Sequence, residues 1–62
     1  MPIIEHEGEK YLQVMAHSAV RPYGNDRLKV LTFEEDGTVQ CKSRTVPHRL
    51  FDAVASIYER NV

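Results

Sequence analysis

LKVLTFEEDGTVQCKS, residues 28–43, has the pattern of two β-strands joined by a tight turn. Residues 28–33 are rich in β-branched and aromatic side chains, and residues 38–43 alternate apolar or small side chains with polar ones. The Glu-Asp-Gly sequence at 35–37 has the composition of a turn. The stretch therefore predicts a β-hairpin.

Two closures of this hairpin place different side chains opposite one another. A two-residue turn would put Phe33 opposite Gln40, so that large apolar groups would lie beside polar ones. A three-residue loop, with Gly37 supplying a positive φ, puts Phe33 opposite Val39 on one apolar side. We predict the three-residue loop.

Beyond residue 45 the apolar period changes from two residues to about 3.6, which is typical of an amphipathic helix. Pro47 suits the first helical turn, and Thr45 is the expected oxygen cap. The apolar face of this helix has five residues: Leu50, Phe51, Val54, Ile57 and Tyr58.

The N-terminal part predicts a second hairpin. Residues 2–6 and 10–20 have the composition of strands, and Glu7-Gly8 between them has that of a turn. Residues 21–27 contain Pro, Gly, Asn and Asp and are expected to form the loop between the hairpins.

The predicted fold is α+β with the order ββββα. An antiparallel sheet of two hairpins carries one C-terminal amphipathic helix on a face, and residues 1–62 form a single small domain. Which face the helix covers is open at this point. Nine residues are expected in the core: Leu12, Val14, Leu31, Phe33, Val39, Leu50, Phe51, Val54 and Ile57.

Residues 28–58 resemble the KTSC domain, a small domain at the C-terminus of some lysyl-tRNA synthetases. The resemblance lies in the order strand, glycine turn, strand, Val-Pro and helix, with Gly37 and Val46-Pro47 at the matching places. The family's Tyr-x-Tyr motif is absent from residues 40–44. The resemblance therefore implies the fold and a role in RNA binding, and it transfers no functional residue.

Composition narrows the classes of function. The formal net charge is -1 and 42% of the residues are hydrophobic, which is ordinary for a folded protein and unlike a dedicated nucleic-acid binder. No apolar run approaches the ~18 residues that span a bilayer, so we expect a cytoplasmic protein without a membrane segment. A domain of this size buries only about 60% of its unfolded surface, which makes a homodimer the expectation.

Enzymatic and metal chemistry have little support. Cys41 with a histidine would form a nucleophile and base, but the predicted register points Cys41 inward as a small apolar residue. His6, His17 and His48 are not at the short spacings that arrange metal ligands with Cys41. We predict a non-enzymatic protein with no metal and no cofactor.

Two surfaces remain as candidates. Leu28 and Val30 lie on the mixed outer face of the hairpin, a composition expected where another protein docks. The leading hypothesis is therefore a small module that binds another protein, as a homodimer. The alternative is an RNA-binding accessory domain whose phosphate-binding stripe comprises six residues: Arg21, Tyr23, Lys29, Lys42, Arg44 and Arg49.

Overall fold

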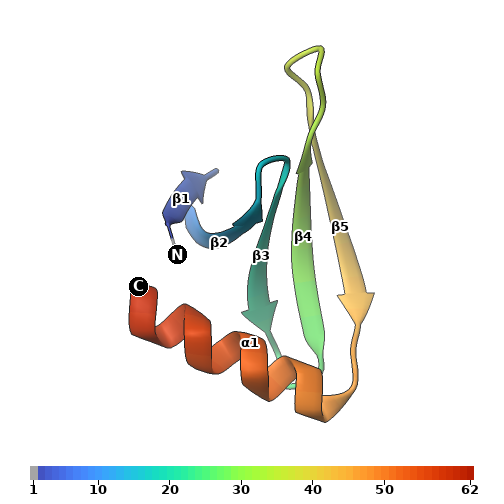
Figure 1. The fold of residues 1–62 in the computed structure, drawn as a ribbon. Helices are drawn as coiled ribbons and strands as arrows, with labels where there is room; N and C mark the ends of the chain where they lie inside the picture. The colour runs from blue at the N-terminus through green and yellow to red at the C-terminus, as the bar shows by residue number, and fades with distance from the viewer. Residues whose placement is uncertain (1) are drawn as a thin grey trace.

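The structure is a computed structural model that describes residues 2–62. One antiparallel sheet has its strands in the order β1-β2-β3-β4-β5, and a single helix follows (Figure 1). The predicted α+β class and C-terminal helix are confirmed. The element bounds are β1 Ile3–His6, β2 Glu9–Met15, β3 Ser18–Tyr23, β4 Arg27–Phe33, β5 Val39–Thr45 and α1 His48–Asn61.

The sheet has five strands where the sequence pattern predicted four. The stretch expected as one strand, residues 10–20, turns back at Ala16-His17 and forms both β2 and β3. A bulge at Val14 shifts the register just before the turn. Neither turn residue is Gly, Pro, Asn or Asp, so composition did not mark the reversal.

Residues 21–27, expected as a loop, are mostly strand. β3 continues to Tyr23, and only Gly24 to Asp26 form the turn to β4. Pro22 is tolerated because its missing N–H costs no hydrogen bond on either side. It lies opposite Leu28 at a pair whose backbone N atoms point away from each other, and the pairing of β3 with β2 ends at Val20. Hydrogen-bonded and non-hydrogen-bonded pairs alternate along β3 and β4. The Phe33 N–H donates to the His17 carbonyl at 2.9 Å at the other end of this strand pair, and this bond fixes which pairs are which.

Two hairpins have the expected turn chemistry. The β4–β5 hairpin closes with the three-residue loop, and Phe33 lies opposite Val39 as predicted. The Gly37 φ is 90°, and its N–H donates to the Glu34 carbonyl. The β1–β2 hairpin closes through Glu7-Gly8, where both φ angles are positive, as a type I′ turn requires. The backbone twist of a type I′ turn matches the right-handed twist of the strands that it joins.

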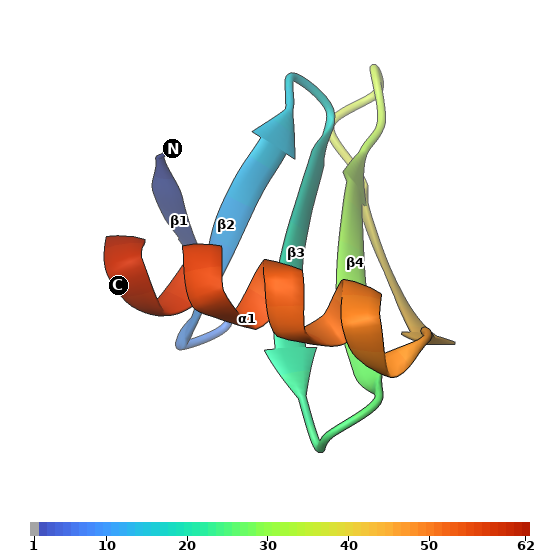
Figure 2. The same ribbon diagram turned by 60° about the horizontal axis from the view of Figure 1, so that its bottom comes forward.

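The helix crosses one face of the sheet, over the ends of β2, β3 and β4 (Figure 2). It begins after Pro47, whose carbonyl accepts the Phe51 N–H at 3.0 Å, and no side chain caps it, so the expected Thr45 cap is wrong. The Tyr58 hydroxyl donates to the Lys10 carbonyl at 2.9 Å and fixes the C-terminal half against β2.

Apolar side chains lie on both faces of the sheet. The helix covers the face that carries Leu12, Val20 and Leu28, which are 1%, 9% and 7% exposed. The opposite face has its own buried cluster of Tyr11, Ala19 and Leu31, with Ile4 and Phe33 packed against it. β1 and β5 recede behind the central strands in Figure 2, so this second face is concave.

The expected core is partly corrected. Leu12 and Leu31 are fully buried, whereas Val14, Val39 and Leu50 are exposed. No residue of α1 is fully buried, and Leu50 at the start of its apolar stripe is 46% exposed. Phe33, Phe51, Val54 and Ile57 are half-buried.

Candidate functional site

β5 is an edge strand with a free outer side. Within residues 2–62 its single neighbour in the sheet is β4, and all seven of its residues are exposed. The strand contains no Pro or Gly, and its pairing with β4 has no bulge. The other edge, β1, has only four residues. β5 is therefore the longer uninterrupted sheet edge of the molecule.

Hydrogen bonds at the two ends of the β4–β5 ladder fix which backbone groups face outward. The Glu34 N–H donates to the Thr38 carbonyl at 2.9 Å. At the other end, the Val46 N–H donates to the Asp26 carbonyl at 2.8 Å. Hydrogen-bonded and non-hydrogen-bonded pairs alternate between these ends, so residues 40, 42 and 44 bond to β4. The backbone N–H and C=O groups of four residues point to the free side: Val39, Cys41, Ser43 and Thr45.

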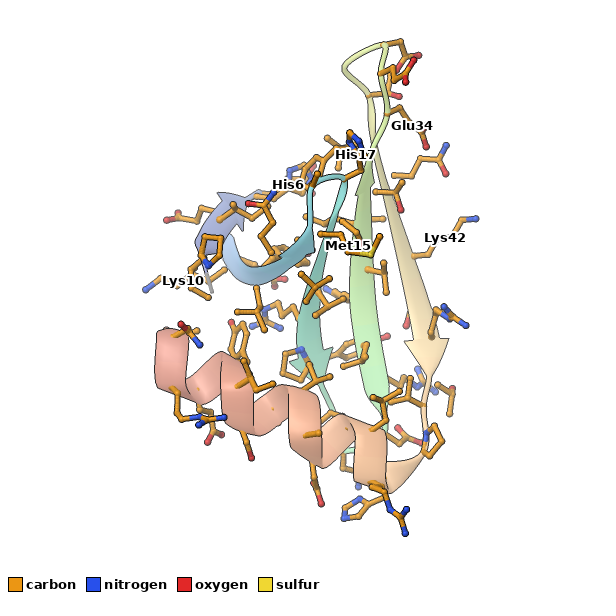
Figure 3. The ribbon with its side chains drawn as sticks, viewed as in Figure 1. His6, Lys10, Met15, His17, Glu34 and Lys42 are labelled. Carbon is orange, nitrogen blue, oxygen red and sulfur yellow. The ribbon has the colours of Figure 1, made fainter. Side chains whose placement is uncertain are left out.

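The side chains of β5 give this edge a charge. Gln40, Lys42 and Arg44 lie on the helix-covered side of the sheet, opposite Thr32, Val30 and Leu28, respectively. Figure 3 shows Lys42 extending away from the strand. Within residues 2–62 neither Lys42 nor Arg44 makes an ion pair. The edge thus carries two exposed cations at alternate positions.

An open apolar hollow lies just beyond the end of β5. It is lined by Pro47, Arg49, Leu50 and Ala53, around the first turns of α1, and its volume of about 680 Å³ is largely open to solvent. Pro47 is two residues past Thr45, the last residue of the strand. Leu50 is 46% exposed, and among the described residues Arg49 has no ion-pair partner. The hollow therefore combines an apolar floor with one cation.

The concave face carries a compact charged group. Glu9 Oε2 lies 3.6 Å from Arg21 Nε and 3.5 Å from Lys29 Nζ. Arg21 and Lys29 are directly opposite one another on β3 and β4, so the carboxylate separates two like charges. The Lys29 ammonium also lies 5.4 Å from the centre of the Tyr23 ring. Both cations thus have Glu9 as an ion-pair partner, although the buried Arg21 Nε has no hydrogen-bond partner within residues 2–62.

Two tyrosines on this face are perturbed in opposite directions. The hydrogen bond between the Tyr23 hydroxyl and the Ser43 hydroxyl lowers the pKa of Tyr23, with nearby Arg27 and Lys29 adding to the effect. Burial raises the pKa of Tyr11, and the neighbouring Cys41 and Glu9 raise it further. Tyr23 thereby connects β3 to the edge strand through a hydrogen bond, and the electrostatic effect on Tyr11 comes from Cys41 of the same strand.

The structure separates the residues of the predicted nucleic-acid stripe. Arg21, Tyr23 and Lys29 face the concave side, where the two cations pair with Glu9. Lys42 and Arg44 lie on the other side of the sheet, and Arg49 lies in the first turn of the helix. Lys42, Arg44 and Arg49 are exposed.

The predicted protein-binding pair is also divided. Leu28 is 7% exposed beneath the helix, so its side chain is already used within the chain. Val30 is half-buried beside Lys42, one strand in from the edge. Sequence reasoning missed the free edge and the hollow. The sequence did contain a signal for the edge. Residues 38–43 were expected to form the last strand of the sheet, so only the strand before them was expected to pair with them.

Within residues 2–62 the structure brings no metal-binding cluster together around Cys41 or the histidines. Cys41 is exposed, and no group of three or more His, Cys, Asp or Glu side chains is placed to hold a metal. His48 Nε2 lies 3.0 Å from Asp52 Oδ2 on the exposed side of α1. No helix in the described part of the chain has the length and apolarity needed to cross a bilayer.

Comparisons with protein-family models, curated proteins and solved structures find no match to this chain. The resemblance of residues 28–58 to the KTSC domain therefore stays a prediction.

Proposed function

We propose that this protein is a small non-enzymatic interaction module that binds an extended, acidic segment of another protein along the free edge of β5. The observation that carries the proposal is the row of outward backbone groups at Val39, Cys41, Ser43 and Thr45, beside the exposed Lys42 and Arg44. Addition of a strand to such an edge supplies main-chain hydrogen bonds, and alternate side chains supply specificity.

The two cations on β5 determine which charge the partner segment should carry. Residues of an added strand that lie opposite Lys42 and Arg44 form non-hydrogen-bonded pairs, in which Cα atoms are about 4.5 Å apart. Opposite charges at such positions stabilise a strand pair, and like charges destabilise it. Acidic residues at alternate positions in the partner therefore match this edge.

The same charges disfavour self-pairing through β5. The register that pairs the whole antiparallel strand with that of a second copy places Lys42 opposite Lys42, a like-charge contact. Lysine on an edge strand is a common protection against edge-to-edge aggregation. The predicted homodimer would therefore use another surface, such as the exposed Val14 and Met15 at the end of β2. Sedimentation at micromolar concentration tests that prediction separately.

Amide hydrogen exchange tests the proposal directly. The test ligand is a synthetic peptide, acetyl-Thr-Thr-Thr-Glu-Thr-Glu-Thr-Thr-amide, and its control has Lys in place of Glu. The acidic peptide should slow exchange at the N–H groups of Cys41 and Ser43, which face the free side. The N–H groups of Gln40 and Lys42 already bond to β4 and should change little. Slowed exchange with the Lys peptide alone, or with neither peptide, would contradict the proposal.

A backbone variant gives the matched control. Ser43→Pro removes an outward N–H and leaves the ladder to β4 intact, because Ser43 does not donate to β4. Peptide affinity should fall about tenfold, the effect of losing one hydrogen bond of ~1.4 kcal/mol. Ser43→Ala removes the hydroxyl that contacts Tyr23 and keeps the N–H, so it should bind the peptide like the parent.

The nucleic-acid alternative predicts a different pattern. Binding of a 12-nucleotide single-stranded RNA would fall steeply with salt, because phosphate contacts release counterions. It would be lost in a Lys42→Glu, Arg44→Glu variant and retained in Ser43→Pro, since no backbone N–H of β5 is needed. That combination would replace the protein-binding proposal with RNA binding.

A further inference from the structure

We infer that the hollow at the start of α1 takes one apolar side chain of the same extended partner, located on the N-terminal side of its acidic residues. The inference rests on the proposed function, because it extends the docking line along β5 into the hollow lined by Pro47, Leu50 and Ala53. It predicts where the apolar residue of the partner lies relative to the acidic residues, in addition to the charge of the partner.

Continuity of the surface is the first step. β5 runs toward the helix and ends at Thr45, and the hollow begins at Pro47. A strand paired with residues 39–45 that continues by two or three residues would therefore extend to the level of Pro47, where the hollow begins. At ~3.3 Å per residue this extension covers roughly 7–10 Å.

Strand direction gives the order of the residues. Every pair of neighbouring strands in this sheet is antiparallel, and antiparallel pairs are two to three times as common as parallel ones. In an antiparallel partner the residue opposite Arg44 precedes the residue opposite Lys42. The apolar residue therefore lies two or three positions before the first acidic residue.

The lining of the hollow supports an apolar occupant from an acidic chain. Leu50 is 46% exposed, and Pro47 and Ala53 provide further apolar surface around it. Arg49 is the charged member of the lining. With Lys42 and Arg44 it extends the exposed positive charge from the strand to the hollow, which matches an acidic segment and opposes a basic one.

Three synthetic peptides test the inference: Leu-Thr-Thr-Glu-Thr-Glu-Thr-Thr, the same peptide with Ser in place of Leu, and the reversed peptide with Leu last. Each peptide is acetylated and amidated. The first should bind about fivefold more tightly than the second, the effect of partly burying a leucine side chain. The reversed peptide should bind like the Ser peptide.

Leu50→Ser should remove the preference for the Leu peptide, so that the variant binds the Leu and Ser peptides equally. Val62→Ser is the matched control, because Val62 is 55% exposed at the C-terminal end of α1, whereas the hollow lies at its first turns, and its variant should keep the fivefold preference. A preference that survives in Leu50→Ser would overturn the inference.

Failure of the inference and failure of the proposed function give different results. If the Leu and Ser peptides bind equally and both slow exchange at Cys41 and Ser43, the docking edge stands and the hollow has no part in it. If neither peptide slows exchange at these amides, the proposed function fails as well. A third result would also overturn the inference. If the Leu and Ser peptides bind equally and the protein forms a dimer that Leu50→Ser dissociates, the hollow binds a second copy of the chain.

Discussion

The pKa of Tyr11 on β2 is raised by burial and, next, by the Cys41 side chain on β5, although β3 and β4 lie between their strands. Three strand spacings amount to about 14 Å in a flat sheet, farther than a tyrosine side chain extends. The influence of Cys41 on Tyr11 is therefore consistent with a sheet that curls toward its concave face, as Figure 2 shows. The Tyr11 ring then lies over Ala19 and Leu31, both 0% exposed.

Alkaline pH should weaken the fold through Tyr11. Burial raises the pKa of Tyr11 above its ordinary value of 10.0, so its neutral form contributes stability that is present below pH 10. That contribution is lost as pH rises through the higher pKa of the folded state. Urea unfolding across this range should show a smaller alkaline loss of stability in Tyr11→Phe than in the parent. Equal losses in the two proteins would show that Tyr11 ionises freely in the folded state.

Leu31→Ala should strongly destabilise the protein. Leu31 is 0% exposed in the concave cluster, and truncating a buried leucine costs about 2–5 kcal/mol. Roughly 3–9 kcal/mol is the whole stability expected for a chain of 62 residues. Leu50→Ala, at a side chain 46% exposed, should change the free energy of unfolding by less than about 0.5 kcal/mol. Similar midpoints in urea for the two variants would contradict the assignment of the core.

Glu9→Gln should destabilise the protein in a salt-dependent way. Glu9 separates Arg21 from Lys29, and without its charge two cations would lie directly opposite one another. Because these groups are partly exposed, the expected cost is only about 0.5–1 kcal/mol at low salt. The cost should shrink in 1 M salt, where the Debye length is about 3 Å. Glu35→Gln in the β4–β5 loop is the control, and an equal effect there would indicate a change in overall charge alone.

The first turn offers a paired test of backbone strain. Glu7 has φ 51°, a left-handed conformation that costs most L-residues roughly 1–2 kcal/mol and that Asn tolerates better. Glu7→Asn should therefore raise the thermal midpoint. Gly8 has φ 82°, so Gly8→Ala should lower it. If both variants melted like the parent, the turn would not be type I′ in solution.

The sequence determined those features that depend on local chemistry. The positive-φ position at Gly37 and the alternating side chains around it specified the three-residue loop and the pairing of Phe33 with Val39. The change to a period of 3.6 residues specified the helix. Each of these signals lies within a few neighbouring residues, where turn and helix preferences act directly.

The tertiary structure decided the rest. The reversal at Ala16-His17 has no turn residues of its own and forms where β3 pairs with both neighbours, a non-local effect. Both faces of β4 carry apolar residues, so the pattern alone did not say that the helix covers Leu28 and that the curled sheet buries Leu31. The last-strand position of residues 38–43 indicated an edge, but only the tertiary structure showed that no other strand covers it within residues 2–62 and that a hollow lies beyond its end.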